Sequence, residues 1–339
     1  MLRIHFDERD IARVQMASAP DPLWETVLAM HQLTAPGNGA PVYAAWRAHA
    51  RAELAERGLT RAARLIHALA PGNARYFPDF LTPDAGRDGL AAGLTALRET
   101  PRDRLTGQLR RAGSAARLPR WVGAVTKGSR RPLDELAVAF REVHRTVVAP
   151  DWTEATATAD RDRAARARTL CHGGVDGMLG SFRPQLRWEP PVLHVDYPRD
   201  RDLRLHGRGL RLIPSHFCWR RPIALADPDL PPVLVYPVEH STSWAPAATR
   251  ACHPQALSTL LGRTRSRVLA ALDAPVTTGE LARRLRVSAP SASAHVSALR
   301  EANLAHSRRD GGCVVHALTP LGAALLHGEL APARLPGRP

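Results

Sequence analysis

The sequence predicts a mainly α-helical protein that has a smaller α+β middle region and ends in three helices, a β-hairpin and a further helix. Three observations support this fold class. Apolar residues recur at helical spacing through most of residues 10–118, and they alternate with polar residues from about Leu186. From Gln255 to Leu326, capping residues and an Asp-Gly pair mark the order helix-helix-helix-hairpin-helix.

The composition is that of a globular protein with an excess of basic residues. The 339 residues include 47 Lys and Arg against 32 Asp and Glu, which gives a net charge of +15. This length suits two or three domains. Lys127 is the only lysine, so part of the arginine content reflects a GC-rich genome. The excess over acidic residues still favours a polyanionic partner, either nucleic acid or a membrane surface.

The sequence favours a cytoplasmic protein with no membrane partner. Its first ten residues are charged and lack the apolar stretch of a signal peptide, and the apolar run of residues 231–238 is too short to cross a bilayer. Cys171, Cys218, Cys252 and Cys313 are too few and too scattered for a disulfide framework, which agrees with a reducing compartment.

The first 250 residues are predicted to pass from helices to strands. Asp21 is a good N-cap, and Pro22 suits the first turn of a helix whose apolar stripe forms part of the core. Residues 132–148 carry a second apolar stripe at helical spacing. The predicted strands are residues 192–195, 203–206, 210–213 and 233–236, and residues 206–209 suit a hairpin turn.

The C-terminal helices are predicted from their caps. One helix carries the apolar stripe of Leu257, Leu261, Val268 and Leu272 and stops at Pro275. Thr277 and Glu280 have the spacing of a capping box, which begins a second, short helix. Ser288 caps a third helix, Pro290 lies in its first turn, and Ala292, Val296 and Leu299 form its buried face.

The third helix leaves small and polar side chains on its outward face, which suits a helix that enters the major groove of DNA. Residues 304–307 and 313–318 then predict two strands around an Arg-rich turn, where Arg308 and Arg309 would meet the phosphate backbone. Residues 258–310 carry nine arginines and four acidic residues, a net charge of +5. The predicted DNA-binding residues are Arg283, Arg284, Ser288, Pro290, Ser291, Ser293, Ala294, His295, Ser297, Arg300, Arg308 and Arg309.

This segment resembles the ArsR-type winged helix-turn-helix repressors. Their pattern Ser-x-Pro-x-x-Ser-x-His-x-x-x-Leu-Arg-x-Ala-x-Leu is met at Ser288, Pro290, Ser293, His295, Leu299, Arg300, Ala302 and Leu304. The resemblance implies a C-terminal winged helix and a homodimeric repressor that binds a pseudo-palindromic operator in double-stranded DNA. Residues 2–6, 20–25 and 202–219 are similar to long actinomycete regulators that place a domain of unassigned role before such a DNA reader.

The expected domains follow from these patterns. They are a mainly helical N-terminal region (residues 1–118), an α+β region for sensing or dimerisation (119–250), a winged helix-turn-helix domain that binds DNA (251–330) and a flexible tail (331–339), with a linker at residues 246–254.

We expect no metal and no cofactor. In metal-sensing members of the family two thiolates precede the recognition helix, but Thr277 and Gly279 stand at those positions. One alternative remains open, because each of the four cysteines has a histidine within three residues, as in a regulator that responds to metal or thiol oxidation. None of these pairs has the spacing of a zinc site.

The long N-terminal part is expected to sense a small organic effector, to dimerise, or both. Aromatic side chains of the β segment are of the kind that line organic-ligand sites, and the candidates are Trp188, Tyr197, His216, Trp219 and Tyr236. A nucleophile elbow, a P-loop, a dinucleotide fingerprint and paired catalytic carboxylates are all absent from the sequence, so we do not expect an enzyme. The remaining alternative is a ligand- or protein-binding module whose winged helix contacts protein.

Overall fold

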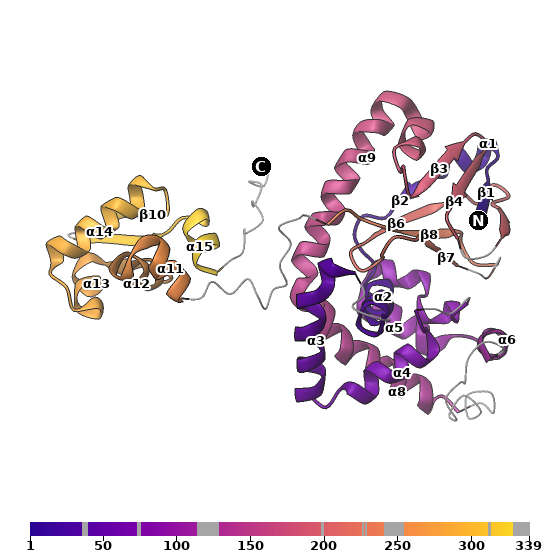
Figure 1. Ribbon diagram of the computed structural model, residues 1–339, viewed down its shortest axis with the longest axis horizontal. Helices are drawn as coiled ribbons and strands as arrows, with labels where there is room; N and C mark the ends of the chain where they lie inside the picture. Colours follow the sequence, from indigo (N-terminus) through magenta and orange to yellow (C-terminus); the bar gives the residue numbers. More distant parts are fainter. Residues whose placement is uncertain are drawn as a thin grey trace. The chain divides into compact units, whose positions relative to one another are not determined.

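The computed structural model describes residues 1–35, 40–72, 76–113, 129–197, 200–225, 227, 229–240, 254–310 and 313–327. The chain is mostly helical and divides into two compact units, residues 1–244 and residues 245–339 (Figure 1). Among the described residues, no helix combines the length and the apolar character that a membrane span requires. The predicted linker falls almost wholly at residues 246–253 and the predicted tail at residues 331–339, both outside the described residues.

The helices of the first unit pack around α2 (Pro22–Thr34). Asp21 caps this helix as expected, because its Oδ1 accepts hydrogen bonds from the amides of Leu23 at 2.9 Å and Trp24 at 3.2 Å. The apolar stripe is wider than one face, since eleven of the thirteen residues of α2 are buried. The other helices of the unit are α1 (Glu8–Ile11), α3 (Ala44–Glu56), α4 (Thr60–Leu69), α5 (Leu90–Glu99), α6 (Arg102–Gly113), α8 (Arg131–Val143) and α9 (Trp152–Gly180), with short 3₁₀ turns at Pro41–Tyr43, Asp79–Leu81, Asp84–Asp88 and Ala149–Asp151.

Two of these helices depart from the regular α form. The helix predicted for residues 132–148 ends as α8 at Val143 and continues as one π-helical segment, His144–Val148. α9 is broken at Gly173 and Gly174, where the φ of +60° at Gly174 is a left-handed conformation that glycine adopts without strain. The chain therefore turns back here, and the residues after the break contact the helix before it.

Two four-stranded sheets complete the first unit. One has the order β3-β4-β1-β5 and the other the order β2-β6-β8-β7. β6 and β8 pair in parallel, so that Leu212 lies opposite Leu234. The strands are β1 (Leu2–His5), β2 (Gln15–Met16), β3 (Leu186–Glu189), β4 (Val192–Val195), β5 (Arg201–Arg204), β6 (Arg211–Ser215), β7 (Ile223–Ala224) and β8 (Val233–Pro237).

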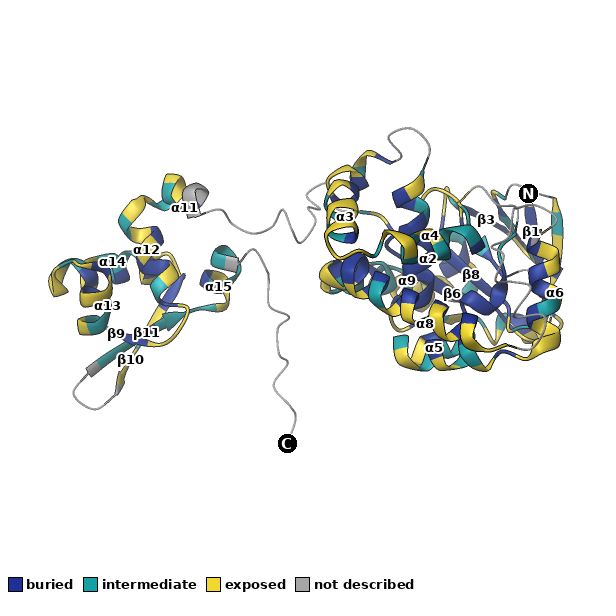
Figure 2. Cartoon of the chain, turned by 90° about the horizontal axis from the view of Figure 1, so that it is seen from below, coloured by how far each residue is buried: buried dark blue, intermediate teal, exposed yellow. Residues whose placement is uncertain are grey.

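The sheet of β6 and β8 separates two hydrophobic cores. Side chains of a strand alternate between its faces. Ile213 and Val235 accordingly belong to the core of the helices, whereas Leu212, Leu234 and Tyr236 belong to a second core with β1, β3, β4 and the end of α9. In Figure 2, β6 and β8 are drawn mostly in the dark blue of buried residues, as expected for strands between two cores.

The packing differs from the division that we expected at residues 1–118 and 119–250. Residues 1–244 form one compact unit, because β1 pairs with β4 and β5 and because α2 shares a core with Ile213 and Val235. The expected hairpin at residues 206–209 is also wrong, since β5 and β6 belong to different sheets. His206, Gly207 and Gly209 do have positive φ angles, so the turn was predicted correctly but its strands do not pair.

The second unit has the element order that the sequence predicted, with two additions. Gly262, at a φ of +85°, divides the first helix into α11 and α12, and a two-residue strand, β9, precedes the next helix. The strands pair in the order β10-β11-β9. The elements are α11 (Pro254–Leu261), α12 (Arg263–Ala271), β9 (Val276–Thr277), α13 (Thr278–Leu285), α14 (Ala289–Glu301), β10 (Ala305–Asp310), β11 (Cys313–Leu318) and α15 (Pro320–His327).

Candidate nucleic-acid interface

Helix α13 begins at Thr277, whose hydroxyl accepts a hydrogen bond from the amide of Glu280 at 3.3 Å. The other half of the expected capping box does not form. The carboxylate of Glu280 instead accepts from Arg284 one turn later, at 2.6 Å. Arg284, a predicted DNA contact, is therefore exposed but paired, and Arg283 is exposed beside it.

The turn between α13 and α14 is held by local backbone geometry. Arg286 ends α13 in the left-handed conformation, with φ +56° and ψ +47°, which lets the chain change direction within a few residues. Ser288 then caps α14, because its hydroxyl accepts from the amide of Ser291 at 3.3 Å. Pro290 occupies the first turn of α14, as expected.

Helix α14 buries one face and exposes another. Ala292, Val296 and Leu299 are at most 2% exposed and share a core with α12 and α13. The opposite face presents the predicted DNA-binding residues of this helix. Ser288, Pro290, Ser293, Ala294 and Arg300 are exposed, and Ser291, His295 and Ser297 are half-buried.

The hairpin of β10 and β11 follows α14 directly and extends away from the helices (Figure 2). Arg308 pairs with Val315 and Arg309 with Val314, and both arginines are exposed. The sequence placed them in a turn, but they lie within β10, so their side chains point to opposite faces of the hairpin. The expected Gly-Gly tip, residues 311–312, lies outside the described residues.

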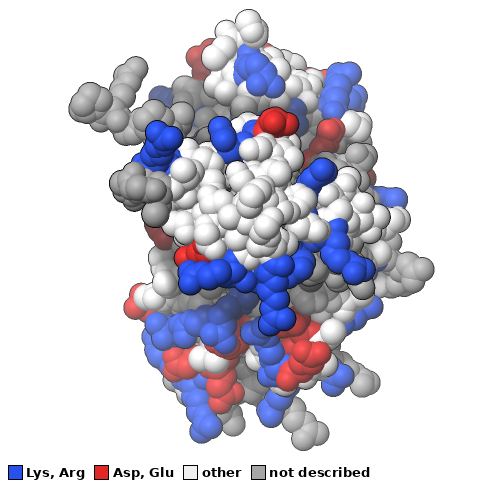
Figure 3. Space-filling view, turned by 90° about the vertical axis from the view of Figure 1, so that its left-hand side faces the viewer, with Lys and Arg blue, Asp and Glu red and all other residues white. Residues whose placement is uncertain are grey.

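Charged side chains border an uncharged area on the face of the molecule that Figure 3 draws. Lys and Arg side chains, with fewer Asp and Glu, lie around a broad area of other side chains. On α14 itself the exposed Ser293 and Ala294 are short enough to let a backbone approach base edges, and Arg300 adds a cation that can meet a phosphate.

The five candidate effector residues do not line one site. Trp188, Tyr236 and, partly buried, Tyr197 belong to the core around β1, whereas His216 and Trp219 lie beside Tyr43 on the other side of the sheet. Trp188 and Tyr236 lie on strands β3 and β8, whereas His216 and Trp219 belong to the segment between β6 and β7, which passes on the other side of the sheet.

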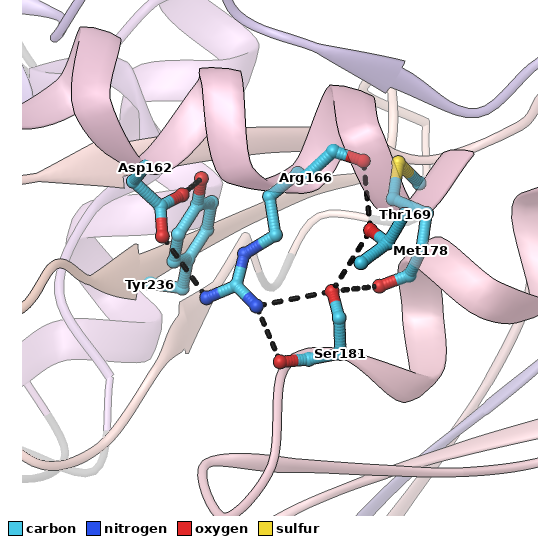
Figure 4. Close-up of polar contacts among 6 residues, drawn as sticks. All are labelled: Asp162, Arg166, Thr169, Met178, Ser181 and Tyr236. Carbon is cyan, nitrogen blue, oxygen red and sulfur yellow. Dashed lines mark hydrogen bonds and ion pairs between the residues drawn. The ribbon is translucent and has the colours of Figure 1, made fainter. Parts of the chain in front are cut away.

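Tyr236 of β8 instead forms a hydrogen bond to α9 (Figure 4). Its hydroxyl donates to Asp162 Oδ2 at 2.6 Å, and Asp162 Oδ1 accepts from Arg166 at 2.9 Å. Arg166 in turn bonds to Ser181 and lies 4.2 Å from the centre of the Phe182 ring. Burial, followed by the nearby carboxylate of Asp162, raises the pKa of Tyr236, so it remains a neutral donor. Tyr236 is therefore a structural residue.

The candidates His216 and Trp219 belong to an aromatic cluster around Tyr43. The hydroxyl of Tyr43 donates to the carbonyl of His216 at 2.6 Å and lies 3.1 Å from His240 Nε2. The ring centre of Trp219 is 5.7 Å from that of Tyr43, and Trp219 is 36% exposed. Of the five candidates, Trp219 and the partly buried Tyr197 have the most surface to offer a ligand.

A small pocket lies elsewhere in the first unit, at the N-terminus of α2. Asp21, Thr82, Asp84 and Arg211 line it together with apolar side chains, and none of the five candidates does. Its cavity of about 20 Å³ holds roughly one water molecule. An organic effector would need a larger space than this.

The proximity of cysteines and histidines does not produce a metal cluster in the described part of the chain. Groups of three or more His, Cys, Asp or Glu side chains that could hold a metal ion are absent among these residues. Cys218 is buried, which raises the pKa of its thiol and keeps it unreactive. Cys171 is exposed, and the pair Cys252 and His253 lies outside the described residues.

The sequence did not identify the polar contacts that connect α13 to β11 and α12, or β11 to β10. His316 bonds to both Thr278 and Ser307, and Arg267 donates to the carbonyl of Leu285 at the end of α13. Both partners of His316 are brought to it by the fold: Ser307 by the pairing of β10 with β11, and Thr278 by the pairing of β9 with β11.

Together, α13, the turn and α14 define a helix-turn-helix, the class of fold that DNA-binding regulators use. Residues 260–308, from the end of α11 into β10, match the family of helix-turn-helix domains. No curated protein and no solved structure matches the chain. The C-terminal unit therefore contains a helix-turn-helix domain, which indicates a DNA-binding transcription regulator.

Proposed function

We propose that this protein is a sequence-specific transcription regulator of the ArsR type, whose C-terminal unit is a winged helix that binds double-stranded DNA. The observation that carries the proposal is the outward face of α14, where Ser293, Ala294 and Arg300 are exposed. In this arrangement α14 enters the major groove and reads base edges, while the β10–β11 hairpin, as the wing, contacts the phosphate backbone.

The regulator acts as a homodimeric repressor on a pseudo-palindromic operator. Exposed apolar side chains support the dimer, since Leu260 of α11 is 71% exposed and Leu321 of α15 is 48% exposed. Contact with a second copy would remove this apolar surface from water, which favours association. Two copies of α14 would then meet successive major grooves about 34 Å apart.

The first unit responds to a small organic effector and has no catalytic role. The cluster of Tyr43, Trp219 and His240 supports this part of the proposal, because it combines aromatic faces with polar groups near the end of the unit. An effector that binds unequally to two states of the unit would change the affinity for DNA.

A gel shift of the full chain tests the proposal. The probe is the DNA upstream of the protein's own gene, titrated at several salt concentrations against a shuffled probe of equal length. A specific shift that weakens as salt rises supports a DNA reader. Equal binding to both probes, or none, would favour the alternative in which the C-terminal unit contacts protein.

Replacing Arg308 and Arg309 together by alanine is expected to weaken binding to every DNA sequence. Each phosphate contact contributes about 0.9 to the slope of log K against log salt, so the slope should become less steep by up to about 2. The matched control, Arg57→Ala with Arg187→Ala, removes the same charge from exposed ion pairs of the first unit. An unchanged slope in the hairpin variant would refute its contact with phosphate.

Ser293→Ala and His295→Ala are expected to relax sequence preference instead. Both side chains lie on the outward face of α14, where lost contacts to base edges cost about 1–3 kcal/mol on the preferred sequence only. Binding to a randomised library, followed by sequencing, measures the change. A uniform loss on all sequences would assign these residues to the backbone rather than to bases.

A further inference from the structure

His316 lies at a junction of the second unit. It belongs to β11, the middle strand of the three-stranded sheet, and is 5% exposed. Its Nε2 is 2.7 Å from the hydroxyl oxygen of Thr278, and its Nδ1 is 2.7 Å from that of Ser307. Thr278 is the first residue of α13, and Ser307 lies opposite His316 on β10. One imidazole thus joins a helix of the helix-turn-helix to the hairpin.

The chemistry of the ring allows both bonds at once. A neutral imidazole has one N–H donor and one acceptor nitrogen, and each hydroxyl can either donate or accept. Both tautomers of His316 therefore satisfy both partners. Burial, and secondly the positive charge of Arg300, lower the pKa of His316, which favours this neutral form.

The two partners of His316 add side-chain bonds to the backbone pairing of β11 with β9, which together hold the hairpin against the helices. Ser307 and Arg309 are two residues apart on β10, so they share one face of the strand, and Arg308 lies on the other. Thr278 is in α13, which shares one core with α14. A rotation of β10 relative to α13 would break the bonds of His316, and the same rotation would move both arginines relative to α14.

We propose that His316 is a positioning residue for DNA binding: it holds Thr278 and Ser307 together, and so fixes the β10 arginines at the place where they and α14 engage one duplex. The inference rests on the proposed function. His316 itself is buried and does not touch DNA. If the imidazole of His316 is removed, the arginines remain on the surface, but the hairpin can adopt other orientations. In these orientations the arginines contact the phosphates less often.

A double-mutant cycle tests this role in the full chain. His316→Phe keeps an aromatic ring and removes both hydrogen bonds, and it should reduce both the affinity for the DNA probe and the salt slope towards those of Arg308→Ala with Arg309→Ala. In the background of that arginine variant, His316→Phe should change the affinity by less than about twofold, because the positioned groups are already gone.

Milder variants keep the test valid if His316→Phe folds poorly. Thr278→Val and Ser307→Ala each remove one bond to His316, and the helix cap is untouched because it is made by Thr277. Each should show a smaller loss of the same kind. Ser266→Ala is the matched control: it deletes a buried hydroxyl 2.9 Å from Ser258 Oγ in the same unit, and it should lower the melting temperature without changing the salt slope.

The outcomes separate this inference from the proposed function. If the wild-type chain shows no sequence-specific, salt-dependent binding, both are overturned. If the wild type binds but His316→Phe and the arginine substitutions act additively, the positioning role alone is overturned. The same holds if Thr278→Val and Ser307→Ala, like Ser266→Ala, lower only the melting temperature. The inference is supported if His316→Phe and the arginine substitutions act non-additively, and if the salt slope is reduced in His316→Phe, Thr278→Val and Ser307→Ala.

Discussion

Gly209→Ala is expected to destabilise the first unit by about 2–5 kcal/mol. Gly209 has a φ of +72°, and a left-handed conformation costs a residue with a Cβ about 1–2 kcal/mol. The added Cβ would lie 2.3 Å from the carbonyl oxygen of Arg13, which is backbone and cannot rotate away. Forced backbone shifts add about 1–3 kcal/mol. The amide of Gly209 also donates to the buried Asp10, and a shift of this backbone in the variant would strain that hydrogen bond too.

Gly207→Ala is the matched control for this prediction. Gly207 has nearly the same φ, +73°, but a Cβ there would meet only the side chain of Arg9, at 3.6 Å. Its cost should be the conformational one alone, about 1–2 kcal/mol. Urea unfolding of the full chain, followed by the fluorescence of the tryptophans in the first unit, measures both. Equal losses in the two variants would contradict the role assigned to Arg13.

Glu25→Gln is expected to change how the stability of the first unit depends on pH. Glu25 is fully buried in α2, and its carboxylate accepts from the amides of His216 at 2.8 Å and Phe217 at 3.0 Å. Burial raises its pKa from an ordinary 4.5 to about 7, although the amides of Phe217 and His216 and the hydroxyl of Ser215 oppose the shift. The folded state therefore binds the proton more tightly than the unfolded state.

The sign follows from that difference. The stability that Glu25 supplies is fully present below pH 4.5 and is lost as pH rises through about 7, by an amount on the order of 3 kcal/mol. The side-chain amide of the Glu25→Gln variant cannot titrate, so the stability of the wild type relative to the variant should fall between about pH 5 and pH 7.5. His31 and His144, whose pKa values burial lowers to about 4, act in the opposite direction in both proteins.

Thermal melts of the two proteins from about pH 4.5 to pH 8 measure the difference curve. Glu53→Gln, at the exposed ion pair with Arg57, is the surface control for the same chemical change. A flat difference between the wild type and Glu25→Gln would show that the buried carboxylate does not change its protonation on unfolding.

The candidate DNA-binding face was largely predictable because its determinants are local. Ser288 and Pro290 identify the start of α14, and the spacing of Val296 and Leu299 identifies its buried side, so the outward residues follow without knowledge of the rest of the fold. The hairpin arginines were placed approximately. β10 continues to Asp310, beyond the predicted end at residue 307, so both arginines lie in the strand instead of the turn, and sequence patterns do not resolve strand ends that closely.

The effector residues and the domain division were not predictable in the same way. Trp188 and Tyr236 belong to the core around β1, whereas His216, which follows β6, lies beside Tyr43 in the core of the helices. Glu280 has the spacing of a capping box, but Arg284 competes for its carboxylate. Each outcome depends on which distant or competing partner is nearest, and that is a property of the packed chain.

The pairing of β1 also constrains how the protein is made. Leu2 lies opposite Val195 on one side and Arg201 on the other, so β1 leaves the ribosome about 190 residues before its partners. At roughly 5–20 residues per second, it would wait about 10–40 s with both edges open. The second unit, whose strands pair within about 40 residues, can fold soon after synthesis. While β1 waits for β4 and β5 to be synthesised, its open edges could pair with other chains. The nascent first unit is therefore the part of the protein that chaperones would need to protect.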